Sequence, residues 1–398
     1  MQVYTRLCNL EQKFPKRRQA VAELALRSLE DKSSNVRRNA IKLLGKLVST
    51  HPFSVMHGGQ LWLKEWNTRL QAVDAQMESL KPPAGSPGLG EKRREHDTTV
   101  DSELLDDATT LASPQKPAKQ VSEEQQAAVM KKVAEEAATS ELLTRLQLTK
   151  KYYSEAIRFI EVLHTASLEV CQLLSSKNKS EVIEAMDFFV ILDAYKIELA
   201  RTGIRRMLRL IWTKGNSDEG KGVQTHLIDC YRGLFFIAPN SFSESDAANF
   251  IARNMISLTS SATPAELTSL EQLLNVMVKA DNVSDLVITK LWQVYGVQKQ
   301  EISRSQRRGA IIILGMLATA DSDIIVREMG LLLRIGLGPL GRRDLVLAKY
   351  SCLALRRMYP SKQQGKDATA PGTKLSNDHA ILTQLAMIVE MVSESKEW

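Results

Sequence analysis

Residues 31–47 read DKSSNVRRNAIKLLGKL, and this stretch decides the fold. Its apolar side chains recur at positions i, i+4, i+7, i+8 and i+11, which places them along one stripe of a helix. The residues of that stripe are Val36, Ala40, Leu43, Leu44 and Leu47. The three polar residues before it can cap the start of the helix, and its small alanine lets a neighbouring helix approach. We expect Asp31 and Arg37 to bridge this helix to the adjacent repeat.

The same register recurs at three places further along the chain. Residues 307–317 read RRGAIIILGML and match from Arg37 onward, including the glycine. Residues 223–234 carry a second copy, and residues 347–355 carry a looser one. Each helix pair buries only one face alone, so pairs must stack on their neighbours. The register resembles the HEAT repeat, so the predicted fold is an all-α HEAT-repeat α-solenoid, in preference to an unrelated helical bundle.

Composition supports this fold and divides the chain into three parts. Of the 398 residues 43% are hydrophobic and only 6% are aromatic, a balance that suits helix packing better than sheet packing. Residues 1–80 and 123–398 are predicted to form HEAT repeats. Residues 81–122 contain five of the twelve prolines and no aromatic residue, and we expect them to be disordered. Ser86 and Ser113 precede prolines there and are candidate sites for proline-directed kinases.

The bulk features exclude several classes of protein. No run of about 18 apolar residues occurs, so we expect no membrane span. The four cysteines lie far apart and show no Cys or His partner at metal-ligand spacing, which predicts buried thiols in a reducing compartment and no metal site. The six histidines are scattered, and we find no catalytic arrangement and expect no cofactor. A net charge of +7 permits contact with nucleic acid without requiring it.

Two glycine patterns resemble nucleotide-binding loops. Residues 215–222 match G-x-x-x-x-G-K, but glycine follows where a phosphate loop needs serine or threonine, and no strand precedes it. Residues 336–341 match G-x-G-x-x-G without the required strand-helix context. We interpret the first as a turn between helices and the second as a loop between repeats, so the chain is predicted not to be an enzyme.

Basic clusters and one tryptophan are the candidates for binding. Guanidinium groups spread over a solenoid face would bind phosphates without reading base sequence. The candidate DNA-binding residues are Arg205, Arg206, Arg209, Arg304, Arg307 and Arg308. For Arg307, which shares a repeat position with Arg37, a structural role that ties repeats together is the favoured alternative. Trp212 closes an apolar helical run beside residues 214–222, where it could anchor a partner or belong to the core.

Four segments carry a resemblance to a known family. Residues 31–53 (DKSSNVRRNAIKLLGKLVSTHPF), 184–200 (EAMDFFVILDAYKIELA), 203–214 (GIRRMLRLIWTK) and 223–235 (VQTHLIDCYRGLF) resemble the first HEAT-repeat subunit of condensin. The resemblance covers nearly the whole chain except residues 81–122. Because members of this family are considerably longer, we expect the sequence to be an internal portion.

The resemblance implies a non-catalytic subunit that binds the kleisin and docks on an SMC ATPase head. It also implies non-sequence-specific DNA contact in the assembled complex, a role in mitotic chromosome condensation, and a location in the nucleus and on chromosomes with a cytoplasmic pool. Within the matching segments we expect the docking surface at Trp212, Lys214, Tyr231 and Arg232. A transport or scaffolding adaptor that binds peptide or protein cargo is the main alternative, and a degenerate nucleotide hydrolase built on residues 215–222 is a third.

Overall fold

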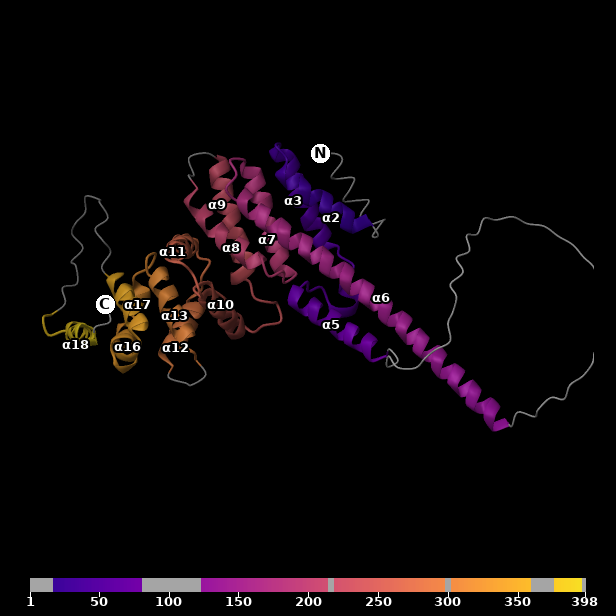
Figure 1. The fold of residues 1–398 in the computed structure, drawn as a ribbon. Helices are drawn as coiled ribbons and strands as arrows, with labels where there is room; N and C mark the ends of the chain where they lie inside the picture. Colours follow the sequence, from indigo (N-terminus) through magenta and orange to yellow (C-terminus); the bar gives the residue numbers. More distant parts are fainter. Residues whose placement is uncertain (1–16, 81–122, 214–217, 298–301, 359–375, 396–398) are drawn as a thin grey trace, which may run out of the picture. The chain divides into compact units, whose positions relative to one another are not determined.

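The computed structural model describes residues 17–80, 123–213, 218–297, 302–358 and 376–395. In these ranges the chain forms helices and turns, and no strand occurs (Figure 1). The predicted all-α fold of HEAT-type helix pairs is therefore confirmed. No helix in the same ranges is long and apolar enough to cross a membrane. Residues 81–122 lie outside the described residues, so their predicted disorder and the predicted domain boundaries stay predictions.

The chain divides into two compact units, residues 62–160 and the remainder, which are described separately. The smaller unit contains α5 (Leu63–Ser79) and the greater part of α6 (Glu123–Leu173). Trp66 of α5 packs on Tyr153 of α6 with ring centroids 5.8 Å apart. Asp74 Oδ1 lies 2.8 Å from Lys150 Nζ. Because these contacts run in opposite order along the two helices, α5 and α6 are antiparallel.

The larger unit contains all the other helices that the structure describes. The first group is α2 (Arg18–Arg27), η2 (Ser28–Glu30), α3 (Ser34–Ser49), α4 (Ser54–His57), α7 (Lys179–Ala194), α8 (Ala200–Met207), η3 (Leu208–Trp212) and α9 (Asp218–Tyr231). The second group is η4 (Arg232–Phe236), α10 (Glu244–Leu258), α11 (Pro264–Lys279), α12 (Asp285–Gly296), α13 (Arg304–Leu317), α14 (Asp323–Val326), α15 (Met329–Leu332), η5 (Leu333–Leu337), α16 (Pro339–Arg343), α17 (Leu345–Arg356) and α18 (Ala380–Ser395).

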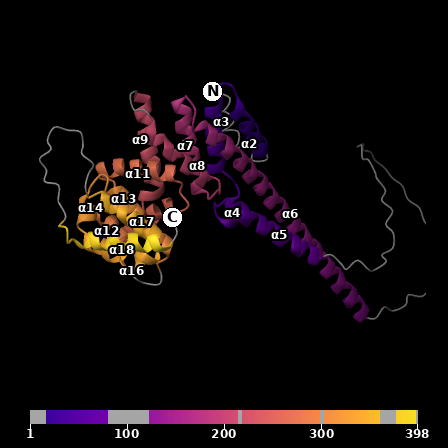
Figure 2. The same ribbon diagram turned by 60° about the vertical axis from the view of Figure 1, so that its left-hand side comes forward.

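Within the larger unit, the helices that carry the repeat register pack on one another. α7 lies between α3 and α9, and α13 packs on α12 and α17 (Figure 2). The apolar stripes predicted from the sequence form these contacts. In α3 the residues from Ala40 to Leu47 on the stripe are buried, and in α13 the same is true of Ala310, Ile313, Leu314 and Leu317. Only Val36, at the start of the first stripe, is half-buried.

The glycine of the register allows close approach between neighbouring helices. A Cβ atom on Gly45 of α3 would lie 3.1 Å from Ile191 Cδ1 of α7. The equivalent Gly315 of α13 would place its Cβ atom 3.4 Å from Ala354 Cβ of α17. The first contact is tighter than ordinary packing and the second is at its limit. The repeat therefore uses glycine to bring backbones together, more strictly in α3 than in α13.

Both glycine patterns are more helical than the sequence predicted. Of residues 215–222, the last five belong to α9, which begins at Asp218, while Gly215 and its two successors lie outside the described residues. Residues 336–341 span the end of η5 and the start of α16 with only Gly338 between them, so the loop predicted there is wrong. A Cβ atom on Gly336 would collide with Ser351 and with Tyr295 Oη, and one on Gly341 with the backbone of Gly336. These glycines are explained by close packing, and no strand-helix phosphate loop is present at either pattern's described residues.

Two helices end in a turn whose left-handed residue is not glycine. At the end of α7, Lys196 has φ of 60° and Ile197 N–H donates to Leu192 O at 3.0 Å. At the end of α11, Asp281 has φ of 55° and Asn282 N–H donates to Met277 O at 2.9 Å. Both are Schellman ends, in which the last carbonyls of a helix are satisfied by the residues that follow it.

Candidate interaction surface

Trp212 ends η3 and combines an exposed ring with a fixed orientation. Its side chain is 55% exposed. Its Nε1–H donates to Oγ of Ser269 at 3.0 Å, on α11, against which η3 packs. Gln224 of α9 donates from Nε2 to the carbonyls of Ile211 and Thr213, at 2.9 and 2.7 Å, and so holds the backbone on both sides of the tryptophan. A large amphipathic ring held in this way is suited to anchoring a partner.

The other residues of the predicted docking surface have different environments. Tyr231 is fully buried, and its hydroxyl donates to the carbonyl of Ile204, so its ring is not available to a partner. Burial raises the pKa of Tyr231 well above its ordinary value. Arg232 is exposed and lies 3.9 Å from Asp229. Arg232 is eight residues beyond Gln224, about 12 Å along the helix, so it does not adjoin Trp212. Lys214 lies outside the described residues.

Two exposed apolar residues that follow Arg232 in the chain were not predicted from the sequence. Ile237 and Phe242 follow η4 and are 57% and 43% exposed. Phe242 packs edge-on against Phe250 of α10 with ring centroids 5.7 Å apart. Asn254 of α10 donates to the carbonyl of Phe235 at 3.3 Å and so ties η4 to the next repeat. Residues 237–242 read IAPNSF and lie between helices, so they carry no helical stripe from which periodicity could identify these two residues.

The three candidate DNA-binding arginines of α8 and η3 differ in their exposure and in their hydrogen-bond partners. Arg205 donates to the backbone carbonyls of Ser260 and, at 3.1 Å, Ser261, at the end of α10. Arg206 and Arg209 are exposed, and Arg209 donates to Ser175 Oγ in the turn before α7. Arg206 and Arg209 are therefore the more exposed pair, whereas Arg205 is half-buried and both of its terminal nitrogens donate to backbone carbonyls.

The three candidate arginines of α13 also differ, since one is exposed and two bind other elements of the fold. Arg304 is exposed at the start of the helix. Arg307 donates to the carbonyls of Tyr295 and Val297 at 3.1 and 2.8 Å. Arg308 binds Asp344 of the next helix pair, with Nε 2.9 Å from Oδ2 and Nη2 2.8 Å from Oδ1. Arg307 and Arg308 therefore join structural elements, as the alternative for Arg307 anticipated.

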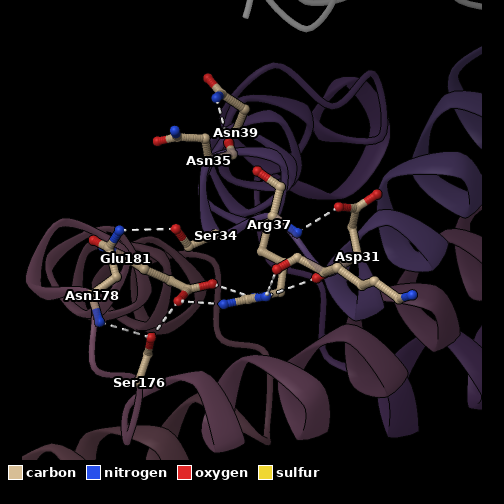
Figure 3. Close-up of polar contacts among 10 residues, drawn as sticks. Asp31, Ser34, Asn35, Arg37, Asn39, Ser176, Asn178 and Glu181 are labelled. Carbon is tan, nitrogen blue, oxygen red and sulfur yellow. Dashed lines mark hydrogen bonds and ion pairs between the residues drawn. The ribbon is translucent and has the colours of Figure 1, made fainter.

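Arg37 joins α3 to α7, and Figure 3 shows its guanidinium directed at Glu181. Arg37 Nε and Nη2 lie 2.5 and 3.0 Å from the two carboxylate oxygens of the fully buried Glu181. Arg37 Nη1 donates to the carbonyl of Asp31 at 2.7 Å. The hydrogen bond to Glu181 raises the pKa of Arg37. The predicted bridge between repeats is present, although Asp31 contributes its backbone and not its carboxylate.

A second polar cluster links α7 to α9. His226 Nε2–H donates to Asp187 Oδ1 at 2.7 Å. Cys230 lies one turn after His226 on α9 and is buried. The hydrogen bond with Asp187, and then that with Cys230, raise the pKa of His226 to about 10. The expectation that no cysteine has a histidine at metal-ligand spacing is wrong for Cys230, because His226 precedes it by four residues. Of the other described cysteines, Cys171 is buried and Cys352 is half-buried.

Comparison with known proteins identifies similar sequences. No protein-family model matches the chain. Condensin complex subunit 1 of Schizosaccharomyces pombe is 43% identical over 401 aligned positions, which cover the whole chain and 33% of that protein. The protein of the same name from Saccharomyces cerevisiae is 39% identical and covers 90% of the chain, and the one from Homo sapiens is 24% identical and covers 63%. The chain thus spans about a third of the length of the fungal relatives.

Proposed function

Because the chain belongs to the condensin complex subunit 1 family, we propose that it is a non-catalytic HEAT-repeat scaffold in condensin, which binds the kleisin and an SMC ATPase head. The observation that carries this proposal is the 43% identity to the Schizosaccharomyces pombe subunit over the whole chain. In this function ATP hydrolysis belongs to the SMC partner, and the scaffold favours one conformation of the head. The subunit would help to engage DNA for mitotic chromosome condensation, in the nucleus and on chromosomes with a cytoplasmic pool.

Trp212 is the proposed anchor for the SMC head. Its exposed ring is supported by Ser269 and its backbone by Gln224, so little conformational entropy is lost when a partner covers it. Arg232 belongs to the same proposal as a separate contact, as do the exposed Ile237 and Phe242, which follow it in the sequence. Tyr231 supports this end of α9 from within the core. Lys214 stays a proposed contact.

Arg206, Arg209 and Arg304 are the proposed DNA contacts within the assembled complex. They are exposed, and their charges would bind phosphates without regard to base sequence. Ser86 and Ser113 lie outside the described residues and stay proposed sites for proline-directed kinases. A transport or scaffolding adaptor is the alternative function, since the same helix pairs could bind a cargo peptide. Salt-sensitive DNA binding distinguishes the two, because an adaptor does not require it.

Co-elution with a purified SMC head on size exclusion, with and without a kleisin segment, tests the proposal. Trp212→Ala is expected to abolish the complex, whereas Trp62→Ala, at a tryptophan that is 50% exposed elsewhere, is the matched control and should leave it intact. Tyr231 is tested as Tyr231→Phe, because an alanine at this buried position would open a cavity in the core. Co-elution that survives Trp212→Ala and Arg232→Ala discards the docking site and keeps the condensin function. Failure of the wild-type chain to bind in any nucleotide state favours the adaptor.

A further inference from the structure

The described residues bring together one group of three side chains that can ligate a metal ion. Asp187 of α7 and His226 and Cys230 of α9 each offer one ligand atom, and these atoms all lie within 4.8 Å of one another. His226 and Cys230 are four residues apart, so they lie on the same face of α9. α7 packs directly on α9, which brings the Asp187 carboxylate to that face. The cluster is therefore determined by the helix packing and not by a loop.

The three ligand types suit zinc. An imidazole nitrogen, a thiolate sulfur and a carboxylate oxygen are the donors found in zinc sites, with bonds of about 2.0–2.3 Å. Tetrahedral bonds of that length place ligand atoms roughly 3.3–3.8 Å from one another. In the structure one pair, His226 Nε2 and Asp187 Oδ1, is closer at 2.7 Å, and no pair exceeds 4.8 Å. Side-chain rotations that move the ligand atoms by about 1 Å would therefore be enough to surround the ion.

From this juxtaposition we propose that Asp187, His226 and Cys230 form a zinc site that joins α7 to α9. Cys230 provides the buried side of the site, while the side chains of His226 and Asp187 are 30% and 46% exposed and leave the ion accessible to solvent. Among the described residues, only these three place a ligand atom in the group. We therefore assign the fourth coordination position to water.

The cluster differs from the other polar links between neighbouring helices. Arg37 with Glu181 and Arg308 with Asp344 pair a cation with a carboxylate, and a guanidinium cannot ligate a metal. In the α7–α9 link, the cation is an imidazole, and a thiol stands beside it. A bound ion would displace the proton from His226 Nε2 and the thiol proton of Cys230 to solvent, and would stabilise the folded chain more the more tightly it binds.

Titration of the metal-free chain with Co²⁺, followed by competition with Zn²⁺, tests the site. Co²⁺ should bind in one equivalent, with d–d bands of a tetrahedral complex and a sulfur-to-cobalt charge-transfer band, and Zn²⁺ should displace it. Cys230→Ser should remove the charge-transfer band, and His226→Gln should weaken Co²⁺ binding at least about tenfold. Cys171→Ser changes a buried thiol that is not in the cluster and should leave the spectrum unchanged.

Thermal unfolding with and without Zn²⁺ gives a readout that does not depend on colour. Zn²⁺ should raise the unfolding temperature of the wild type and of Cys171→Ser, and should have no such effect on His226→Gln. Far-ultraviolet circular dichroism verifies that each variant keeps its helices. The proposal is overturned if the wild type gives no tetrahedral cobalt spectrum, or if the spectrum survives in both Cys230→Ser and His226→Gln. In either case the cluster is only an ionic link between the two helices.

Discussion

Arg37 and Glu181 are 144 positions apart in the chain, yet two hydrogen bonds join them, from Nε to Oε1 at 2.5 Å and from Nη2 to Oε2 at 3.0 Å. Glu181 is fully buried and also accepts hydrogen bonds from Ser176, whereas 19% of the arginine side chain is exposed. The pair joins α3 to α7, which come before and after residues 81–122 in the sequence. Loss of the arginine would leave a buried carboxylate with too few donors, which is costly in a protein interior.

Arg37→Ala is expected to lower the free energy of unfolding by about 3 kcal/mol, because the carboxylate of Glu181 stays buried without its cation. The double variant Arg37→Ala with Glu181→Gln should recover part of that loss, since the uncompensated charge is removed. Urea unfolding monitored by circular dichroism measures both. Lys46→Ala, at an exposed position of the same helix, is the control and should change stability by less than about 0.5 kcal/mol. Equal losses for Arg37→Ala and Lys46→Ala would contradict the assigned role.

The link between Arg308 and Asp344 should make stability depend on pH in the acid range. Burial raises the pKa of Asp344, but hydrogen bonds from Arg308 and from the backbone of Leu347, with the charge of Arg308, outweigh burial and lower it. A carboxyl whose pKa is lowered by folding contributes stability above its unfolded pKa of about 3.9, and this contribution is lost as the pH falls through the folded value.

Asp344→Asn is therefore expected to cost about 1 kcal/mol near neutral pH, a modest value because the Arg308 side chain is 36% exposed to solvent. Asparagine can still cap α17 through Leu347 N–H, so only the charge is removed. The difference between wild type and variant in urea unfolding curves should shrink toward zero as the pH falls below the ordinary carboxyl range and through the lowered pKa of Asp344. A difference that stays constant throughout the acid range would mean that the ion pair contributes nothing.

Replacing glycine with alanine should have different effects on stability at two positions. At Gly203 of α8, a Cβ atom would overlap the ring of Phe189, and Gly203→Ala is expected to lower stability by about 1–3 kcal/mol. At Gly315 of α13 the nearest atom would be 3.4 Å away, so Gly315→Ala should be neutral, or stabilise by up to about 1 kcal/mol through its helix propensity. Thermal melts of both variants provide the comparison. A melting temperature that falls equally in both would refute the distinction.

Arg206 and Arg209 are expected to contribute to DNA affinity through charge alone. Replacing each with alanine should weaken binding of the assembled complex to duplexes of unrelated sequence to a similar extent, and should reduce the slope of log K against log salt by about 1 per arginine. Fluorescence anisotropy at several salt concentrations measures the slope. Arg205→Ala is the matched control, because Arg205 is half-buried and donates to the backbone carbonyls of Ser260 and Ser261, and the slope for this variant should stay at the wild-type value. An unchanged slope for Arg206→Ala and Arg209→Ala would remove these residues from the DNA surface.

Local periodicity was sufficient to predict the helices but not their partners. The stripe from Ala40 to Leu47 identified the buried face of α3 because a helix places residues three and four apart on one side. It could not identify Glu181 as the partner of Arg37, since that contact depends on the packing of a helix far away in sequence. The loop expected at residues 336–341 is mostly helical, because Gly336 serves close packing against Ser351 and Tyr295 and not chain flexibility.

In the candidate site, too, the sequence predicted local features but not the contacts between distant helices. Tyr231 falls in the apolar stripe of α9, next to Cys230, and that membership predicted its burial more directly than it predicted a role in docking. The exposure of Trp212 could not be predicted by counting, because the chain tightens into the 3-10 turn η3 and the period of 3.6 residues no longer holds. The spacing of His226 and Cys230 was a usable signal. Its third member, Asp187, became visible only when α7 packed on α9.

The Schellman ends of α7 and α11 bear on protein engineering. Lys196 and Asp281 occupy a backbone conformation that glycine adopts without steric cost, and each therefore carries a strain that glycine would relieve. Glycine at these two positions, away from every proposed contact, is a route to a more heat-resistant chain for crystallisation or reconstitution.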